Sequence, residues 1–183
     1  MKKNKILSKK YKALPELKEF EELVGHFIQY WGFKKIHGRI WAHLYTSKVP
    51  LDSQSLMMRL KVSKALMSLA VRDLLEFDVI AAASVGKHGV TYYEANPDLL
   101  SVITNVLKKR EAPMMAAVDS CLQRMISKSE TKLQQTNLDV KKLQGVKILT
   151  ESAIGLLGLF ITQSCATSQT DNLNIFSELK FEK

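Results

Sequence analysis

Residues 50–95 decide the fold, and they read PLDSQSLMMRLKVSKALMSLAVRDLLEFDVIAAASVGKHGVTYYEA. The segment SQSLMMRL predicts a short helix, because Leu56 and Leu60 lie one turn apart. Asp52 before it is a residue type that caps helix N-termini, and Ser63 offers a second cap after the tight connection KV. This stretch therefore begins with a short helix, a tight turn and a second, capped helix.

The second helix is expected from Lys64 to Phe77. Met67, Val71 and Leu74 recur at helical spacing and share the face that would be buried. The opposite face carries Ala65, Leu66, Leu69 and Arg72, with Ser68 at its edge. This helix would pack on its domain with one side and leave the other side exposed.

The end of the stretch predicts a β-hairpin. VIAAASV (79–85) and VTYYEA (90–95) are β-prone runs on either side of GKHG (86–89), whose glycines suit a turn. Lys87 and His88 would lie at the tip, where a side chain does not pack into the hydrophobic core.

Two helices are expected ahead of this stretch. Apolar residues recur at helical spacing between Leu17 and Trp31, and Gly32 ends that helix. FKKIHGRIWAHLYTSK (33–48) predicts the next helix, in which Gly38 allows close packing against a neighbour. Its apolar stripe comprises Ile36, Ile40, Leu44 and Tyr45.

A helix, a short helix, a tight turn, a capped helix and a hairpin, in this order, make a winged helix-turn-helix. The DNA major groove admits one α-helix, and a helix N-terminus favours a phosphate through its free amides and dipole. The formal net charge of +9 points to a polyanion such as nucleic acid or an acidic membrane surface. A protein that is merely basic and soluble would carry the same charge.

The same residues resemble the GbsR-like branch of the MarR superfamily of transcriptional regulators. The likeness covers residues 16–125, and the last helix follows only by pattern. Its motifs are Gly32, Gly38-Arg39-Ile40, Pro50-Leu51, Leu56, Leu60, Val62-Ser63-Lys64, Arg72, Leu74 and Tyr92-Tyr93-Glu94-Ala95. The resemblance implies a homodimer whose long helices pack together, whose two recognition helices read a palindromic site and whose activity responds to a small molecule.

This chain departs from the family pattern at four positions. Lys61 and Asp78 stand where the family commonly has glycine, and aspartate tolerates a left-handed backbone better than lysine does. Leu66 and Leu69 are apolar where the family tends to have small or polar residues facing DNA. Leucine makes no base hydrogen bond but can contact thymine methyl groups, and the alternative is that both leucines pack on another protein.

The candidate DNA contacts combine the recognition helix, the hairpin tip and two further arginines. They are Ser63, Lys64, Ala65, Leu66, Ser68, Leu69, Arg72, Lys87, His88, Arg39 and Arg59. Cations that neutralise phosphates release counterions, so binding should weaken steeply with salt. Each of these charges could equally be an ordinary solvated side chain.

Aromatic residues gather where the first two helices should meet. The candidate effector site consists of Tyr30, Trp31, Trp41 and Tyr45, with Phe33 nearby. Ring faces attract cations, so a cage for a quaternary ammonium effector is one interpretation. The other is an ordinary hydrophobic core between the helices.

The chain is expected to have four parts: a basic, flexible arm (1–15), the winged helix-turn-helix (16–97), a helical dimerisation region (98–166) and a tail (167–183). Pro113 either starts a helix or kinks a long one. The last helix should run roughly from Gln134 to Cys165, with Gly155 and Gly158 allowing close helix approach in the dimer.

Chemistry at an active site is not expected. His26, His37, His43 and His88 lack metal-ligand spacing, and no Ser–His–Asp order, phosphate-binding glycine loop or carboxylate pair stands out. We therefore predict neither an enzyme, nor a metal, nor a cofactor.

The compartment is predicted from three features. Cys121 and Cys165 lack a CxxC partner and suit a reducing compartment. The lysine-rich N-terminus has no signal-peptide core, and the apolar run 153–161 is too short to span a bilayer. A cytoplasmic protein with no membrane role is expected.

The sequence thus predicts a mainly α, dimeric, sequence-specific DNA-binding regulator of transcription. The alternative is a winged helix that serves as a protein–protein interaction module without DNA readout. Leu66, Leu69 and the modest basicity of the recognition helix favour that alternative.

Overall fold

The computed structural model describes residues 14–128 and 135–167 of the 183-residue chain, without the side chains of Lys87 and of residues 165–167. Most of the predicted N-terminal arm, the polar segment 129–134 and nearly all of the predicted tail lie outside the described residues. The chain divides into two compact units, one ending at Pro97 and the other beginning at Asp98.

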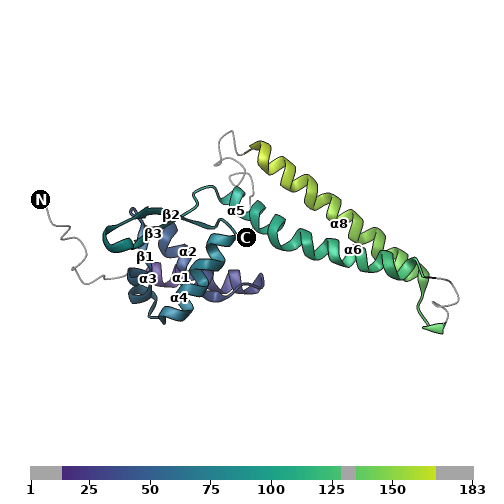
Figure 1. The fold of residues 1–183 in the computed structure, drawn as a ribbon, viewed down its shortest axis with the longest axis horizontal. Coiled ribbons are helices and arrows are strands. Elements are labelled where there is room, and N and C mark those ends of the chain that lie inside the picture. The colour runs from purple at the N-terminus through teal and green to yellow at the C-terminus, as the bar shows by residue number, and fades with distance from the viewer. Residues whose placement is uncertain (1–13, 129–134, 168–183) are drawn as a thin grey trace, which may run out of the picture. The chain divides into compact units, whose positions relative to one another are not determined.

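The first unit is a winged helix-turn-helix (Figure 1). Its elements are α1 (Pro15–Tyr30), α2 (Lys35–Tyr45), β1 (Leu51–Asp52), α3 (Ser53–Leu60), α4 (Lys64–Glu76), β2 (Ile80–Val85), a 3₁₀ turn (Lys87–Gly89) and β3 (Thr91–Ala95). The predicted helices and hairpin are all present. Asp52 and Ser63 cap α3 and α4 as expected, since their side chains accept hydrogen bonds from the amides of Ser55 and Leu66.

The hairpin belongs to a three-stranded antiparallel sheet of order β1-β3-β2. Leu51 of β1 pairs with Tyr93, and Ile80 of β2 pairs with Ala95. The sequence predicts Asp52 only as a helix cap and predicts no strand at this position. Two residues are too short a run for an alternating pattern, so only the pairing with β3 identifies this strand.

The core of the first unit contains the apolar faces predicted for α2, α3 and α4. It comprises Ile36, Ile40, Leu44, Leu51, Leu56, Leu60, Met67, Ala70, Val71, Leu74 and Ile80. Tyr45 is an exception to the predicted α2 stripe: the residue is 42% exposed. It follows Leu44 directly, and adjacent residues on a helix point in different directions.

α1 packs on α2 through small and polar residues. A Cβ atom on Gly38 would lie 2.7 Å from the Val24 carbonyl oxygen, so the predicted close approach is present. Glu21 and Gly25 are the buried residues of α1. Leu17, Val24 and Ile28 of this helix are half-buried. Other apolar side chains of α1 and of its C-cap are exposed: Phe20, Leu23, Phe27, Tyr30 and Trp31.

The second unit consists of helices. Its elements are α5 (Leu99–Val106), a π turn (Leu107–Glu111), α6 (Ala112–Ile126) and α8 (Val140–Thr167). α8 runs back alongside α6, and α8 also contacts α5 (Figure 1). The last helix begins six residues later than the predicted Gln134, because Asn137 turns left-handed and Asp139 accepts a hydrogen bond from the amide of Lys142.

Pro113 lies within one continuous helical path. The residues joining the π turn to its neighbours, Val106 and Ala112, keep right-handed helical angles. Pro113 lacks an amide hydrogen and its ring crowds the preceding turn, so a wider turn before it relieves the clash. Pro113 therefore lies in the first turn of α6, as in the first of the two predicted alternatives, although the helical path continues into α6 from the π turn before it.

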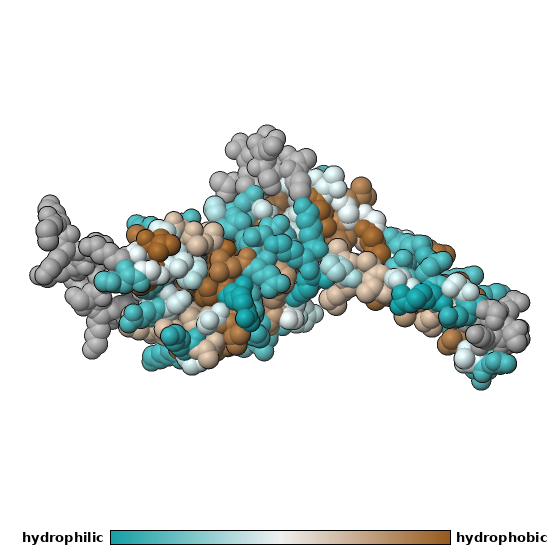
Figure 2. Space-filling model, in the orientation of Figure 1, coloured by the Kyte–Doolittle hydropathy of each residue, from teal (hydrophilic) through white to brown (hydrophobic). Residues whose placement is uncertain are grey.

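α8 has an exposed apolar surface. Ile148, Leu149, Leu156, Leu159 and Phe160 are each at least 44% exposed, and hydrophobic surface is visible on both units in Figure 2. By length and composition alone, Val140–Ser164 could cross a membrane. The nine-residue apolar run 153–161 is too short to predict such a span. Length and composition are weak evidence, because helices covered by protein pass the same test.

Candidate nucleic-acid interface

The outward face of α4 is the centre of the candidate interface. Met67, Ala70, Val71 and Leu74 anchor the helix in the core. The residues predicted to contact DNA from this helix are all exposed: Ser63, Lys64, Ala65, Leu66, Ser68, Leu69 and Arg72. The N-terminus of α4 therefore presents its first turn and its free amides outward.

Cations flank this face. Lys64 and Arg72 are exposed, and no ion pair joins either of them to a carboxylate in the described part of the chain. Arg59 is half-buried on α3. An unneutralised cation on an exposed face attracts a polyanion, and Lys64 lies in the first turn of α4, where the amides also favour a phosphate.

The middle of the face is apolar. Leu66 is 36% exposed and Leu69 is 44% exposed. Ala65, Leu69 and Arg72 lie four and then three residues apart, so they form one stripe along the outward side. Leu69 is central on this face, and Leu66 lies at its edge.

The hairpin tip is a tight turn beside strand ends. The Gly86 amide donates a hydrogen bond to the Val90 carbonyl over 2.8 Å. His88 and Gly89 both have left-handed backbones, with φ of 61° and 73°. His88 is exposed, so its imidazole is available at the tip, as predicted.

Asp73 fixes α4 against α2. Its carboxylate accepts hydrogen bonds from Lys34 Nζ at 3.2 Å and from His37 Nε2 at 3.1 Å. Burial alone would raise the pKa of Asp73, but Lys34 and His37 together hold it below its ordinary value. The orientation of α4 thus depends on two side chains at the start of α2.

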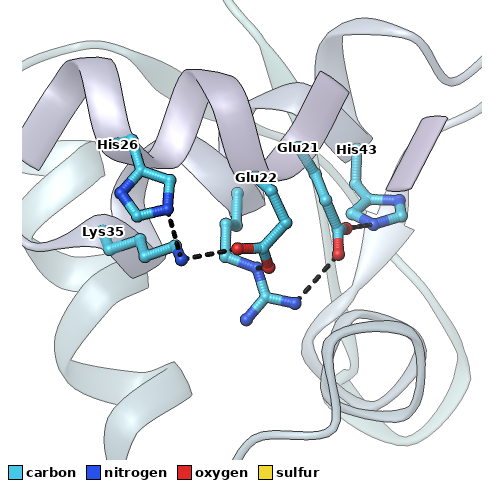
Figure 3. Close-up of polar contacts among 6 residues, drawn as sticks. Glu21, Glu22, His26, Lys35 and His43 are labelled. Atoms are coloured by element: carbon cyan, nitrogen blue, oxygen red, sulfur yellow. Dashed lines mark hydrogen bonds and ion pairs between the residues drawn. The ribbon is translucent and has the colours of Figure 1, made fainter. Parts of the chain in front are cut away.

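A second polar cluster joins α1 to α2 (Figure 3). Glu21 is 4% exposed and accepts a hydrogen bond from Arg39 Nη2 at 2.9 Å; its other oxygen contacts His43 Nε2. Arg39 also pairs with Glu22 over 3.2 Å. A buried carboxylate is stable only when it is paired and hydrogen-bonded, so this cluster explains how α1 can bury a glutamate.

Lys35 extends the cluster. Its Nζ lies 2.5 Å from Glu22 Oε2 and 3.0 Å from His26 Nε2, as Figure 3 shows. The hydrogen bond from Lys35 is the main reason why the pKa of Glu22 lies below its ordinary value. The start of α2 is therefore held to α1 by a continuous set of charges.

Both buried histidines favour the neutral form. Burial is the main cause that lowers the pKa of His37, and the Asp73 charge only partly opposes it. Burial likewise lowers the pKa of His43, opposed by Glu21 and reinforced by Arg59 and Arg39. These histidines act as hydrogen-bonding groups within the fold.

The structure places one predicted contact residue inside the α1–α2 cluster. Two carboxylates bind the Arg39 guanidinium, so this arginine has a structural partner on its own chain. The sequence did not predict Glu21 and Asp73 as partners of histidine. The available signal was a carboxylate within a helix, one turn before Gly25 or beside an apolar face, but this signal identifies no partner.

Aromatic rings of the first unit contact one another at several separate places. Trp41 stacks on Tyr45 with ring centroids 4.7 Å apart, and Phe27 lies 6.1 Å from Trp31. Phe33 packs edge-on against Phe77 at 5.6 Å. Tyr30 is 90% exposed. The aromatic cage stays a prediction. The alternative, a hydrophobic core between the helices, does not fit Tyr30 and Tyr45, because both rings are exposed.

Among the described residues, no group of three or more His, Cys, Asp or Glu side chains could hold a metal ion. The histidines that the structure does bring near carboxylates are those of the two helix-joining clusters.

Comparison with known proteins supports the fold. No protein-family model matches the chain, and no curated protein matches it. A solved structure described as the crystal structure of a transcriptional regulator is similar in fold, with a TM-score of 0.63 and 18% sequence identity. The similarity covers 85% of this chain and 100% of that one. At this identity the likeness concerns the fold alone.

Proposed function

We propose that this winged helix-turn-helix protein is a sequence-specific DNA-binding regulator of transcription of the GbsR-like branch of the MarR superfamily. The observation that carries the proposal is the outward face of α4, with its capped N-terminus and the cations Lys64 and Arg72. A helix of this kind fits the major groove, and its first residues reach base edges. The similar solved structure, itself described as a transcriptional regulator, is consistent with this role.

The proposed complex has the hairpin beside the recognition helix. Lys87 and His88 at the tip would follow the neighbouring minor groove or its backbone. Contacts to phosphate position a protein on DNA, whereas contacts to base edges provide sequence specificity. Arg39, held by Glu21 and Glu22, is left out of the proposed contact set.

We further propose a homodimer that binds a palindromic operator. The exposed apolar residues of α8, among them Leu149, Leu156 and Leu159, would be buried by a second copy. Two recognition helices would then occupy successive major grooves. Occupying an operator blocks transcription sterically, and an effector that alters the spacing of the two helices would alter affinity.

A mobility-shift experiment tests DNA binding. The full chain is mixed with a specific site obtained by selection from random DNA, and with unrelated DNA, at two salt concentrations. We expect a specific complex whose affinity falls steeply with salt, because phosphate contacts release counterions. Arg72→Ala and Lys87→Ala should each weaken the complex about ten-fold or more, as expected when a charged hydrogen bond to DNA is lost.

Lys142→Ala is the matched control, since Lys142 is an exposed lysine of α8. It removes the same charge and should leave affinity for the site nearly unchanged. If no selected DNA were bound more tightly than unrelated DNA, the proposal would be wrong. Retention of a protein partner through Leu66 and Leu69 would then favour the interaction-module alternative.

A further inference from the structure

The proposed DNA complex leaves one feature of α4 unexplained: two leucines at the centre and edge of a face that should meet a polar groove. Leu66 and Leu69 are 36% and 44% exposed, and the core of the unit is complete without them. Both side chains are accessible on the face that would meet the major groove, so a ligand bound there would contact them.

We propose that Leu66 and Leu69 read thymine methyl groups, so that the operator half-site carries A·T pairs with thymines opposite the first two turns of α4. This inference rests on the proposed DNA-binding function. In the major groove, thymine is the base that presents a methyl group at C5, and apolar side chains contact it. Leucine has no hydrogen-bonding atom, so it discriminates by this methyl group and by shape.

The position of the leucines in the helix supports base contact. Leu66 is the third helical residue, and its amide donates to the Ser63 cap over 3.3 Å. Leu69 lies less than one turn further along. Residues at the N-terminal end of a recognition helix are those that reach base edges, whereas residues near its C-terminal end lie farther from the groove floor.

The charges around the leucines favour DNA over an apolar protein partner. Lys64 lies before them, Arg72 lies after them, and both are exposed. Two leucines and Ala65 make a small patch between cations, whereas protein-docking patches are usually larger and continuous. A polyanion with methyl groups in its groove matches both the charges and the apolar centre.

The remaining polar groups of the face have a complementary role. Ser68 and Arg72 can donate hydrogen bonds, and arginine pairs with guanine through two of them. The expected half-site is therefore a run of A·T pairs with thymines facing Leu66 and Leu69, next to a guanine facing Arg72.

The test uses the full chain and the site that it selects from random DNA. Each thymine of the half-site is replaced in turn by deoxyuridine, which removes only the methyl group, and the dissociation constant is measured by fluorescence anisotropy at constant salt. At one or two positions per half-site we expect binding to weaken about four-fold, the factor that corresponds to burying one methyl-sized group.

Protein variants assign the effect to residues. In Leu66→Ala and Leu69→Ala the penalty for deoxyuridine should disappear at the position that each leucine contacts, although affinity for the thymine site falls. Both leucines are exposed, so neither variant should unfold. Leu14→Ala truncates another exposed leucine, outside α4, and should keep the full deoxyuridine penalty.

The outcomes separate this inference from the function it rests on. Specific binding that is indifferent to deoxyuridine at every position, or a penalty that persists in both leucine variants, would overturn the thymine-reading role alone. A selected half-site without thymine opposite α4 would do the same. Failure to select any specific DNA would overturn the proposed function itself.

Discussion

Lys61 shows how one residue can strain an otherwise regular turn. It follows α3 with a left-handed backbone, φ 54° and ψ 48°. Asp78 after α4 has φ 55°, and its carbonyl accepts a hydrogen bond from the Asn96 amide group. Both positions therefore have a left-handed backbone without the glycine that usually adopts it.

Replacing Lys61 by glycine should stabilise the protein. A non-glycine residue in the left-handed region costs about 1–2 kcal/mol, and the extra freedom of glycine in the unfolded chain offsets about half of this. We expect Lys61→Gly to raise the free energy of unfolding by about 1 kcal/mol in chemical denaturation. Lys61→Ala keeps the strain, so an equal gain in that variant would show that the left-handed angle is not the cause.

Two buried histidines make stability depend on pH. The pKa values of His37 and His43 are lowered in the folded chain, mainly by burial. The unfolded chain therefore binds protons more readily, and acid favours it. The stability that the neutral forms contribute is fully present above about pH 6.5 and is lost as pH falls through the lowered pKa values.

Denaturant unfolding between about pH 7.5 and pH 5 measures this effect. We expect the free energy of unfolding of the intact chain to fall over this range, and His43→Gln to reduce the slope. A stability that is constant with pH, or a slope unaffected by His43→Gln, would show that burial of neutral histidine is not the cause.

At the scale of elements, the α1–α2 pair is joined by a close backbone approach and by charges. Gly38 lies against the Val24 carbonyl and Gly25. Glu21, Arg39 and His43 fill the adjoining space with paired polar groups. Because these contacts hold α1 on α2, exposed apolar side chains of α1 are not needed for this packing and remain accessible on the first unit.

Gly38→Ala should separate these two helices. The added Cβ atom would lie 2.7 Å from a backbone oxygen, which cannot move without moving α1. Overpacking of this kind costs about 1–3 kcal/mol, so the melting temperature should fall by several degrees.

Gly145→Ala provides a contrast for that variant. A Cβ atom at Gly145 meets nothing within 4 Å, so this substitution should leave α8 intact or stabilise it through the higher helix propensity of alanine. Equal effects of the two substitutions would show that the contact at Gly38 does not decide stability.

At the scale of the whole molecule, the proposed homodimer accounts for the apolar surface of α8. Leu149, Leu156 and Leu159 lie at helical spacing and are each at least 68% exposed. The second copy of the proposed homodimer would cover these side chains, which are exposed in the described part of one chain. Gly155 and Gly158 have open space around them within one chain.

Leu156→Asp should disrupt the dimer. Burying one leucine contributes about 1.5–3 kcal/mol, and a charge in its place also costs desolvation. We expect sedimentation of the wild-type chain to show a dimer and that of the variant a shift towards monomer, with binding to a palindromic site weakened by at least about ten-fold. Gln144→Asp, a charge at an exposed polar position of α8, should stay dimeric. A wild-type monomer at micromolar concentration would contradict the proposal.

The local elements could be predicted from the sequence because their causes are local. The capping side chains of Asp52 and Ser63, the spacing of Met67, Val71 and Leu74, and the glycine turn of the hairpin all act within a few residues. Such short-range preferences agree with the final fold, so reading them in order led to the winged helix-turn-helix.

Tertiary structure decided what depends on distant residues. The strand β1 exists because Leu51 meets Tyr93, and the roles of Asp73 and Glu21 exist because they meet His37 and His43. The same is true of Arg39, a predicted DNA contact that two glutamates of α1 hold. Sequence periodicity says which face a residue occupies, but the partner on that face comes from another element, and only the folded chain selects it.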